Sequence, residues 1–235
     1  MAGRLELTPP VARVAGITHR LVSTRYPPVG IFDSVASGDD LVALFELEGW
    51  TSDRLGAEVG KLEMLPQSEW VTGVQGATSI MAAFCYPSPE GGRFTGPDLG
   101  AWYCALDLET AIAETAHHNR RRLLKAGMLH AVIQMRQLVA EVDAAFHDIR
   151  GQQAIRPELY DPNDYAASQT FAADLRGGGS NGIAYDSVRR QGGHCLAVFR
   201  PRLVPAALQG DHWEYRWNGS PEPVVTRLTN KGTGG

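Results

Sequence analysis

Three side chains close together in the sequence could act on a charged, planar ligand. Arg93 follows two glycines, Tyr103 lies in an apolar run, and Glu114 lies in an alanine-rich helical pattern. An arginine binds phosphate oxygens through its planar fork, an aromatic ring stacks on a flat ring, and a carboxylate stabilises a developing positive charge. These are the groups that a site cleaving a dinucleotide requires.

Each of these residues also has an ordinary structural interpretation. The glycines before Arg93 allow a close approach to a ligand, but such an arginine is also common on a surface. Tyr103 could belong to the core; in a site its ring would stack and its hydroxyl would be free to bond. Glu114 lies within about 60° of the inward-facing Ala111 and Ile112 on a helix, so it faces either a ligand space or solvent.

A fourth candidate is Ser187, at the end of a later apolar run. Alternation at period two puts Tyr185 and Ser187 on one face of a strand. No Gly-x-Ser-x-Gly elbow surrounds Ser187, so we interpret its hydroxyl as a hydrogen-bonding group toward a ligand and not as a nucleophile. The glycine-rich stretch 177–182 precedes a strand instead of following one and lacks a P-loop ending, which argues against both common nucleotide-binding loops.

Metal and disulfide chemistry are not indicated. The three cysteines are odd in number, far apart and without Cys-x-x-Cys spacing, which predicts reduced, buried thiols in a cytoplasmic protein. His117 and His118 are adjacent and therefore point apart on a helix, so they do not form a two-histidine metal face.

Composition narrows the classes of function. The chain has 235 residues, of which 43% are hydrophobic and 20% charged, enough for one sizeable core. The net charge of −4 argues against nucleic acid or an anionic membrane as the main partner. The basic run 117–122 is either a nucleic-acid patch or, as we favour, the solvated end of a helix. No run of about 18 apolar residues predicts a membrane span, and the first residues lack the apolar core of a signal peptide.

The elements that would position the candidate residues can be read in order. In the first half we expect a frayed lead-in over 1–16, a strand over 18–23, a turn around 26–30 and an apolar anchor at 31–32. A helical pattern then begins at residue 39 or 40 and runs to 47. A second begins at residue 51 or 52 and runs to 62, and Pro66 limits it. Buried strands are predicted over 80–86 and 101–106.

In the second half, Asp107 is the expected N-cap of a helix over 108–125 that stops at Gly127. Strands are predicted over 129–135 and 139–142, followed by a loop with a little helix over 143–160. Asp161-Pro162 would open a helix that carries Tyr165 and ends at the glycines 177–179. Further strands are expected over 182–188, 195–199, 213–217 and 224–228, and a loose tail over 229–235. The simplest organisation is one α+β domain over residues 1–235.

Several stretches, taken in order, resemble the RES-domain family. They are His19-Arg20-Leu21-Val22 with Arg25-Tyr26-Pro27-Pro28, Gly92-Arg93-Phe94-Thr95, Trp102 to Leu106, Glu109 to Glu114, Gly182 to Arg189 and Gly192 to Phe199. They cover most of residues 18–200, and their order and spacing together are specific. Two departures stand out: Thr95 replaces a frequent Ser or Asn, and the region 39–80 is longer than in short members.

This resemblance implies a fold, an activity and a partner. The fold would be α+β and ADP-ribosyltransferase-like, with a central, mostly antiparallel, split β-sheet flanked by helices. The activity would consume NAD without a metal, with catalytic roles for Glu114, Arg93 and Ser187 and NAD-binding roles for Arg93, Tyr103, Ser187 and Arg20. Family members are typically toxins of bacterial toxin–antitoxin pairs, so a cognate Xre-like antitoxin is expected.

Three functions remain open at the level of sequence. The favoured one is an NAD-degrading toxin that cleaves the nicotinamide–ribose bond by hydrolysis or phosphorolysis, as an NAD glycohydrolase or phosphorylase. The others are a mono-ADP-ribosyltransferase that modifies a protein and a non-enzymatic binding module. The acceptor is open, and so is the oligomeric state, although Trp213 and Trp217 look exposed and would suit an interface such as that of a homodimer.

Overall fold

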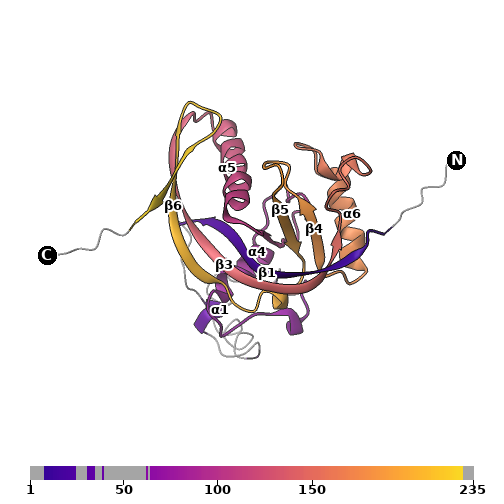
Figure 1. Ribbon diagram of the computed structural model, residues 1–235. Coiled ribbons are helices and arrows are strands. Elements are labelled where there is room, and N and C mark those ends of the chain that lie inside the picture. Colours follow the sequence, from indigo (N-terminus) through magenta and orange to yellow (C-terminus); the bar gives the residue numbers. More distant parts are fainter. Residues whose placement is uncertain (1–7, 25–30, 35–38, 40–61, 63, 230–235) are drawn as a thin grey trace.

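The computed structural model describes residues 8–24, 31–34, 39, 62 and 64–229. Within these residues seven strands form one sheet in the order β1-β2-β5-β4-β3-β6-β7, flanked by helices (Figure 1). Neighbouring strands are antiparallel, except that β3 and β4 are parallel. The expected α+β class with a mostly antiparallel sheet is confirmed. The strands are β1 (Val11–Ser23), β2 (Trp102–Ala105), β3 (His130–Asp148), β4 (Gly182–Asp186), β5 (His194–Val198), β6 (Leu208–Asn218) and β7 (Val224–Leu228).

The sheet is split into a long ribbon and a smaller three-stranded part. β1 pairs with β3 along its whole length, and β6 and β7 extend this ribbon. The short strands β2, β5 and β4 join it only at two places, His19 opposite Ala105 and residues 147–148 beside 183–184. In Figure 1 the ribbon curves around β4, β5 and α5 (Leu108–Lys125). This curvature brings the ribbon, β4, β5 and α5 together although they are distant from one another in the sequence.

Two predictions about the long strands are wrong. Residues 11–16, expected in a frayed lead-in, belong to β1, and residues 143–148, expected in a loop, continue β3. Each stretch completes the other's backbone hydrogen bonds, and Arg13 pairs with Asp143 across them at 2.6 Å. Because the partner strand supplies these contacts, pairing extends both strands beyond their local hydrophobic patterns.

The run 80–86 was predicted as a buried strand, but it lies in a helix, α4 (Ala77–Cys85). A short apolar run buried among other elements has no pattern that separates strand from helix. The backbone N–H groups of Gly76 and Thr78 donate to the carboxylate of Asp33, in α1 (Ile31–Ser34), at 2.8 and 2.9 Å. A carboxylate distant in the sequence thus accepts the hydrogen bonds of N–H groups at the start of this helix. The buried residues of α4 recur at helical spacing and are Ala77, Ile80, Met81, Phe84 and Cys85.

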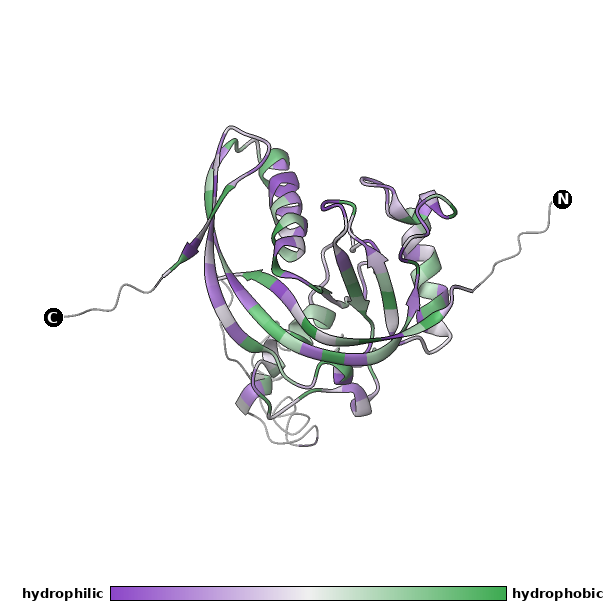
Figure 2. Cartoon of the chain, viewed as in Figure 1, coloured by the Kyte–Doolittle hydropathy of each residue, from purple (hydrophilic) through white to green (hydrophobic). Residues whose placement is uncertain are grey.

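The helix that carries Glu114 has the predicted bounds. α5 runs over Leu108–Lys125, and the Asp107 side chain accepts from the Thr110 N–H at 2.8 Å. Gly127 has a φ of 67°, the left-handed conformation that commonly ends a helix. The solvated side of α5 is visible in Figure 2 as hydrophilic residues toward its C-terminal end.

The next helix starts later than predicted. α6 spans Ala166–Gly177, so Asp161-Pro162 does not open it, whereas its end at the glycines is confirmed. The Asp161 carboxylate instead accepts from the N–H groups of Asn163 and Asp164, both at 2.7 Å, which folds a turn before the helix. The little helix expected before this turn is η2 (Pro157–Tyr160); the other short helices are η1 (Gln67–Glu69) and η3 (Pro201–Leu203).

The two faces of the sheet each bury a separate core. Along β5, Leu196 and Val198 pack with α4, whereas Cys195 and Ala197 pack with the elements around α5. This alternation follows from the period of two in a strand. Cys85, Cys104 and Cys195 are all buried thiols outside any disulfide, as predicted.

The C-terminal strands are confirmed, but the exposure of their tryptophans is not. Trp217 is only 2% exposed and Trp213 is half-buried, because both face the core on the α5 side. They therefore do not offer the exposed aromatic surface that was expected of an interface. The predicted turn at 26–30, most of the helices over 39–62 and the tail from 230 lie outside the described residues.

Candidate active site

Glu114 faces inward from the middle of α5. Its carboxylate accepts a hydrogen bond from the Ser187 hydroxyl at 2.6 Å, and its side chain is half-buried. Burial raises the pKa of Glu114 above its usual value, while the Ser187 hydrogen bond and the charges of Arg189 and Arg93 act in the opposite direction. The structure therefore places this carboxylate in an inward, partly desolvated setting with donors around it.

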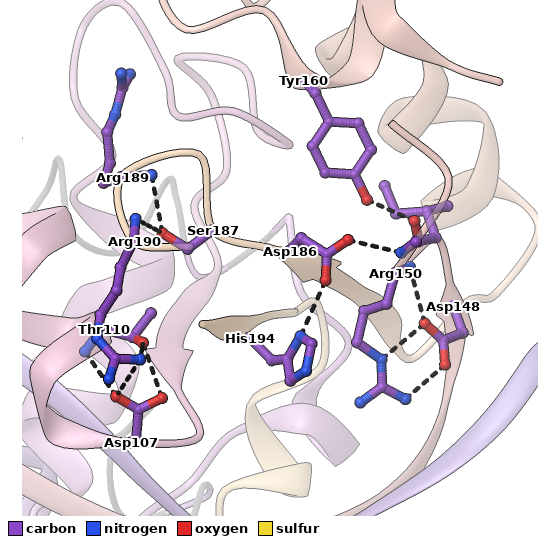
Figure 3. A network of polar contacts seen from close by, with 12 residues as sticks. Asp107, Thr110, Asp148, Arg150, Tyr160, Asp186, Ser187, Arg189, Arg190 and His194 are labelled. Carbon is purple, nitrogen blue, oxygen red and sulfur yellow. Dashed lines mark hydrogen bonds and ion pairs between the residues drawn. The ribbon is translucent and has the colours of Figure 1, made fainter. Parts of the chain in front are cut away.

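Ser187 follows β4 and is 5% exposed. Its Oγ accepts from the backbone N–H groups of Arg189 and Arg190 at 3.0 and 3.1 Å, and its hydroxyl donates a hydrogen bond to Glu114. Figure 3 shows the two backbone contacts. Because the oxygen already accepts two hydrogen bonds, this serine orients the carboxylate and is poorly disposed to act as a nucleophile.

The loop that carries Ser187 is fixed at both ends (Figure 3). At its start, the Asp186 carboxylate accepts from the Gly151 N–H at 2.6 Å and contacts Nδ1 of His194 at 3.0 Å. Farther along, the Arg190 guanidinium lies 3.5 Å from the Asp107 carboxylate, at the N-cap of α5. The loop is thus tied both to β5 and to the helix that carries Glu114.

Arg93 is buried, at 7% exposure, so the surface interpretation is wrong. It lies in a tight hairpin in which Gly92 and Thr95 pair, and Gly91 adopts a φ of 72°. Its Nη1 donates to the carbonyls of Leu159 and Asp161 at 3.0 and 2.8 Å. No carboxylate among the described residues forms an ion pair with this guanidinium, whose charge lowers the pKa of Glu114.

Tyr103 fixes the Arg93 hairpin. Its hydroxyl accepts from the Phe94 N–H at 2.9 Å and pairs with Thr95 Oγ1 at 3.1 Å. The prediction of a free hydroxyl is therefore wrong, because the hairpin closes over it. Gly92 is required here, since a Cβ at this position would lie 2.7 Å from the Tyr103 hydroxyl oxygen.

Arg20 lies against β2 beneath this hairpin. Its Nη1 donates to the Tyr103 carbonyl at 2.9 Å, and its guanidinium lies 5.0 Å from the Trp102 ring centroid. Burial lowers the pKa of Arg20. The structure thus connects Arg20 to the strand that supports Arg93 and gives it no described contact with Glu114 or Ser187.

Three residues that the sequence did not assign to the site lie close to its members. Arg189 lowers the pKa of Glu114 and donates through Nη2 to the Pro162 carbonyl. Tyr165 lies under Arg93, with 4.7 Å between the guanidinium carbon and the ring centroid. His117 is one turn from Glu114, and burial with three nearby arginines lowers its pKa to about 4. For Arg189 and His117 the sequence signal was proximity to Ser187 and Glu114. Tyr165 is close to neither in the sequence and was assigned only to a helix face.

An open cleft of about 770 Å³ lies beside Ser187. A smaller hollow of about 340 Å³ around Trp70 contains none of the candidate residues. Of the candidate residues only Ser187 lines the larger cleft, whose volume suits a ligand of dinucleotide size. Its lining residues are Gln153, Pro157, Tyr160, Pro162 and Asp186 to Gly192.

The described residues contain neither a metal-binding cluster nor a membrane-spanning helix. Among the described residues no group of three or more His, Cys, Asp and Glu side chains is placed to hold a metal ion. The rings of His117 and His118 meet edge to face, with centroids 5.7 Å apart, so they do not point apart as predicted. In the described part of the chain, no helix combines the length and apolar character of a bilayer span.

Comparisons with known proteins place the chain in a family. It is 29% identical over 205 residues to the uncharacterized protein y4oC of Sinorhizobium fredii (strain NBRC 101917 / NGR234), covering 86% of this chain and 83% of that protein. A solved structure, the M. tuberculosis MbcT–MbcA toxin–antitoxin complex, has a chain that aligns at 13% identity and a TM-score of 0.47, covering 93% of this chain and 87% of that one. The family model of the RES domain matches residues 69–218, which include Arg93, Glu114 and Ser187. This chain belongs to the RES domain family.

Proposed function

We propose that this protein degrades NAD by cleaving the bond between nicotinamide and ribose. The observation that carries the proposal is the inward, half-buried Glu114 carboxylate, which Ser187 holds at 2.6 Å beside the charges of Arg93 and Arg189. An anionic group near two cations suits a substrate that has both a cationic reacting centre and an anionic pyrophosphate.

The chemistry of the bond explains why this arrangement suffices. The nicotinamide nitrogen is cationic in NAD, so when the C1′–N bond breaks, the electron pair neutralises the leaving group and no general acid is needed. Positive charge then develops on the ribose, as in glycoside cleavage. The Glu114 carboxylate would stabilise this charge, and an acceptor oxygen would form the new bond to C1′. Water would release a proton in this step, whereas an anionic phosphate oxygen has none to release.

The other residues divide between binding and support. Arg93 has Nη1 occupied by backbone carbonyls, and its remaining N–H groups would bind the pyrophosphate oxygens. Ser187 would keep Glu114 oriented and ionised. The contacts of Tyr103 and Arg20 support roles in holding the Arg93 hairpin and β2, which would make their contribution to NAD binding indirect.

The biological role we propose is that of a toxin in a bacterial toxin–antitoxin system. Membership of the RES family supports this proposal, because the family's members are typically such toxins. A protein that drains NAD must be silenced in its own cell, so we propose a cognate antitoxin, of the Xre-like type, that covers the cleft beside Ser187.

The test is the NAD concentration over time with purified protein, in the presence and absence of inorganic phosphate. We expect NAD loss with the wild type and loss slowed at least about 100-fold with Glu114→Ala. Dependence on phosphate would identify phosphorolysis, and independence would identify hydrolysis. A labelled protein band from labelled NAD, without bulk loss, would instead establish protein ADP-ribosylation. The absence of any turnover or labelling would contradict the proposal and favour a binding module.

A further inference from the structure

One short segment contacts arginines from three different parts of the chain. We name residues 159–165, from the end of η2 to the residue before α6, the arginine-binding segment. Its Leu159 and Asp161 carbonyls accept from Arg93, and its Pro162 carbonyl accepts from Arg189. At its end, the Tyr165 ring lies against the guanidinium groups of both Arg93 and Arg121.

The segment is built to hold its shape. At its base, Leu159 and Tyr160 are buried, and the Tyr160 hydroxyl donates to the Ile149 carbonyl. In its middle, the Asp161 carboxylate accepts two backbone N–H groups, which closes the turn. A fixed turn presents its carbonyls and its aromatic ring in set directions, and thereby fixes the arginines that contact them.

Tyr165 is the side chain that acts on Arg93. The Arg93 guanidinium carbon lies 4.7 Å from the ring centroid and that of Arg121 lies 5.8 Å away, both within the range of a cation–π contact. The ring face therefore restrains the plane of the Arg93 guanidinium, while the two carbonyls restrain Nη1. Because the ring and the carbonyls restrain the guanidinium in different ways, the N–H groups of Arg93 on the side away from Nη1 point in one direction.

The contacts that hold Arg93 are all uncharged. Arg121, the other cation over the ring, has a carboxylate partner in Glu90 at 3.8 Å. Arg93 has none among the described residues, and is held only by carbonyls and a ring. A carboxylate in the place of Tyr165 would also hold the arginine, but it would compete with an anionic ligand. An aromatic face orients the cation and leaves its charge available.

We propose that Tyr165 is a positioning residue that acts through Arg93, orienting this guanidinium for an anionic ligand beside Glu114. The assignment of that ligand as NAD rests on the function proposed above. The orientation of Arg93 itself does not depend on it, so the two can be tested separately.

The experiment compares Tyr165→Leu with two controls. Tyr165→Phe keeps the ring face. Phe171→Leu removes a ring within α6 that lies under Arg156, 5.7 Å from its guanidinium carbon and outside the site. For each protein we would record the side-chain Nε–H resonance of Arg93 by ¹⁵N NMR, assigned by its absence in Arg93→Lys, and the KM and kcat for NAD.

For Tyr165→Leu we expect the Arg93 resonance to lose its ring-current shift and kcat/KM to fall roughly five- to tenfold, mainly through KM. In Tyr165→Phe and in Phe171→Leu, the Arg93 resonance and kcat/KM should both stay close to their wild-type values. An unaltered Arg93 resonance in Tyr165→Leu would overturn the proposal, and so would an altered resonance with unchanged kcat/KM. If the resonance moves but the wild type does not turn over NAD, the proposed function fails while the contact of Tyr165 with Arg93 stands.

Discussion

Replacing Glu114 by glutamine tests the central charge of the site with little change of shape. Glutamine keeps an oxygen that can accept from the Ser187 hydroxyl, whose bond to Glu114 is 2.6 Å long, and it removes the negative charge. A full charge developing about 4 Å from the carboxylate, at an effective dielectric constant of about 20, would be stabilised by about 4 kcal/mol. That is an upper bound of about 1,000-fold in rate, since the transition state carries only part of the charge.

We therefore expect Glu114→Gln to lower kcat for NAD loss by about 100- to 1,000-fold, with little change in KM. The assay is the initial rate of NAD consumption at saturating NAD. Glu109→Gln is the matched control, because Glu109 is an exposed glutamate in the first turn of the same helix. A folded Glu114→Gln protein with a rate within about threefold of wild type would refute the electrostatic role.

The same variant has a second, independent signature in stability. Burial raises the pKa of Glu114 above its value in the unfolded chain, so ionising this group destabilises the folded protein. The penalty is absent below the unfolded pKa, grows as the pH rises toward the folded pKa, and is complete above it. Glu114→Gln should therefore become more stable relative to wild type as the pH rises through this window, as measured by urea unfolding at several pH values. A pH-independent difference would contradict the burial argument.

Three further changes give separate predictions. Ser187→Ala removes a hydrogen bond that lowers the pKa of Glu114, so the acid limb of the pH–rate profile should move to higher pH; an unmoved limb would contradict this coupling. Asp107→Ala removes the N-cap of α5 and should lower the free energy of unfolding by about 1 kcal/mol in urea titrations. Gly92→Ala forces a Cβ into the Tyr103 hydroxyl and should reduce kcat/KM for NAD on the order of ten- to 100-fold by displacing Arg93, whereas Gly96→Ala, which meets no atom within 4 Å, should not. Equal activities of the two alanine variants would refute the role of the hairpin.

The elements predicted correctly are those whose ends are specified locally. The bounds of α5 follow from the capping carboxylate of Asp107 at one end and Gly127 at the other, both read directly from the sequence. The strands predicted over 182–188 and 195–199 were likewise confirmed as β4 and β5, which the structure pairs with each other. In each case the signal lies within a few residues of the element it defines.

The elements predicted wrongly depend on distant partners. α4 starts where Asp33 satisfies its first N–H groups, and the ends of β1 and β3 exist because each strand completes the other. The turn at 161–165 holds carbonyls toward arginines from other segments. A local pattern contains no information about such partners, because the energy comes from contacts formed only after folding.

The sequence by itself determined which kinds of group the site contains. It identified Arg93, Glu114 and Ser187 as candidates, from a double glycine, an inward helix position and a strand alternation, and it indicated the RES family. Only the tertiary structure decided how they meet: Ser187 donates to Glu114, Tyr103 closes the Arg93 hairpin, and Tyr165 lies under Arg93. The physical reason is that residue type sets the charge and hydrogen-bonding capacity of a side chain, whereas its partner, orientation and pKa depend on what folding brings beside it.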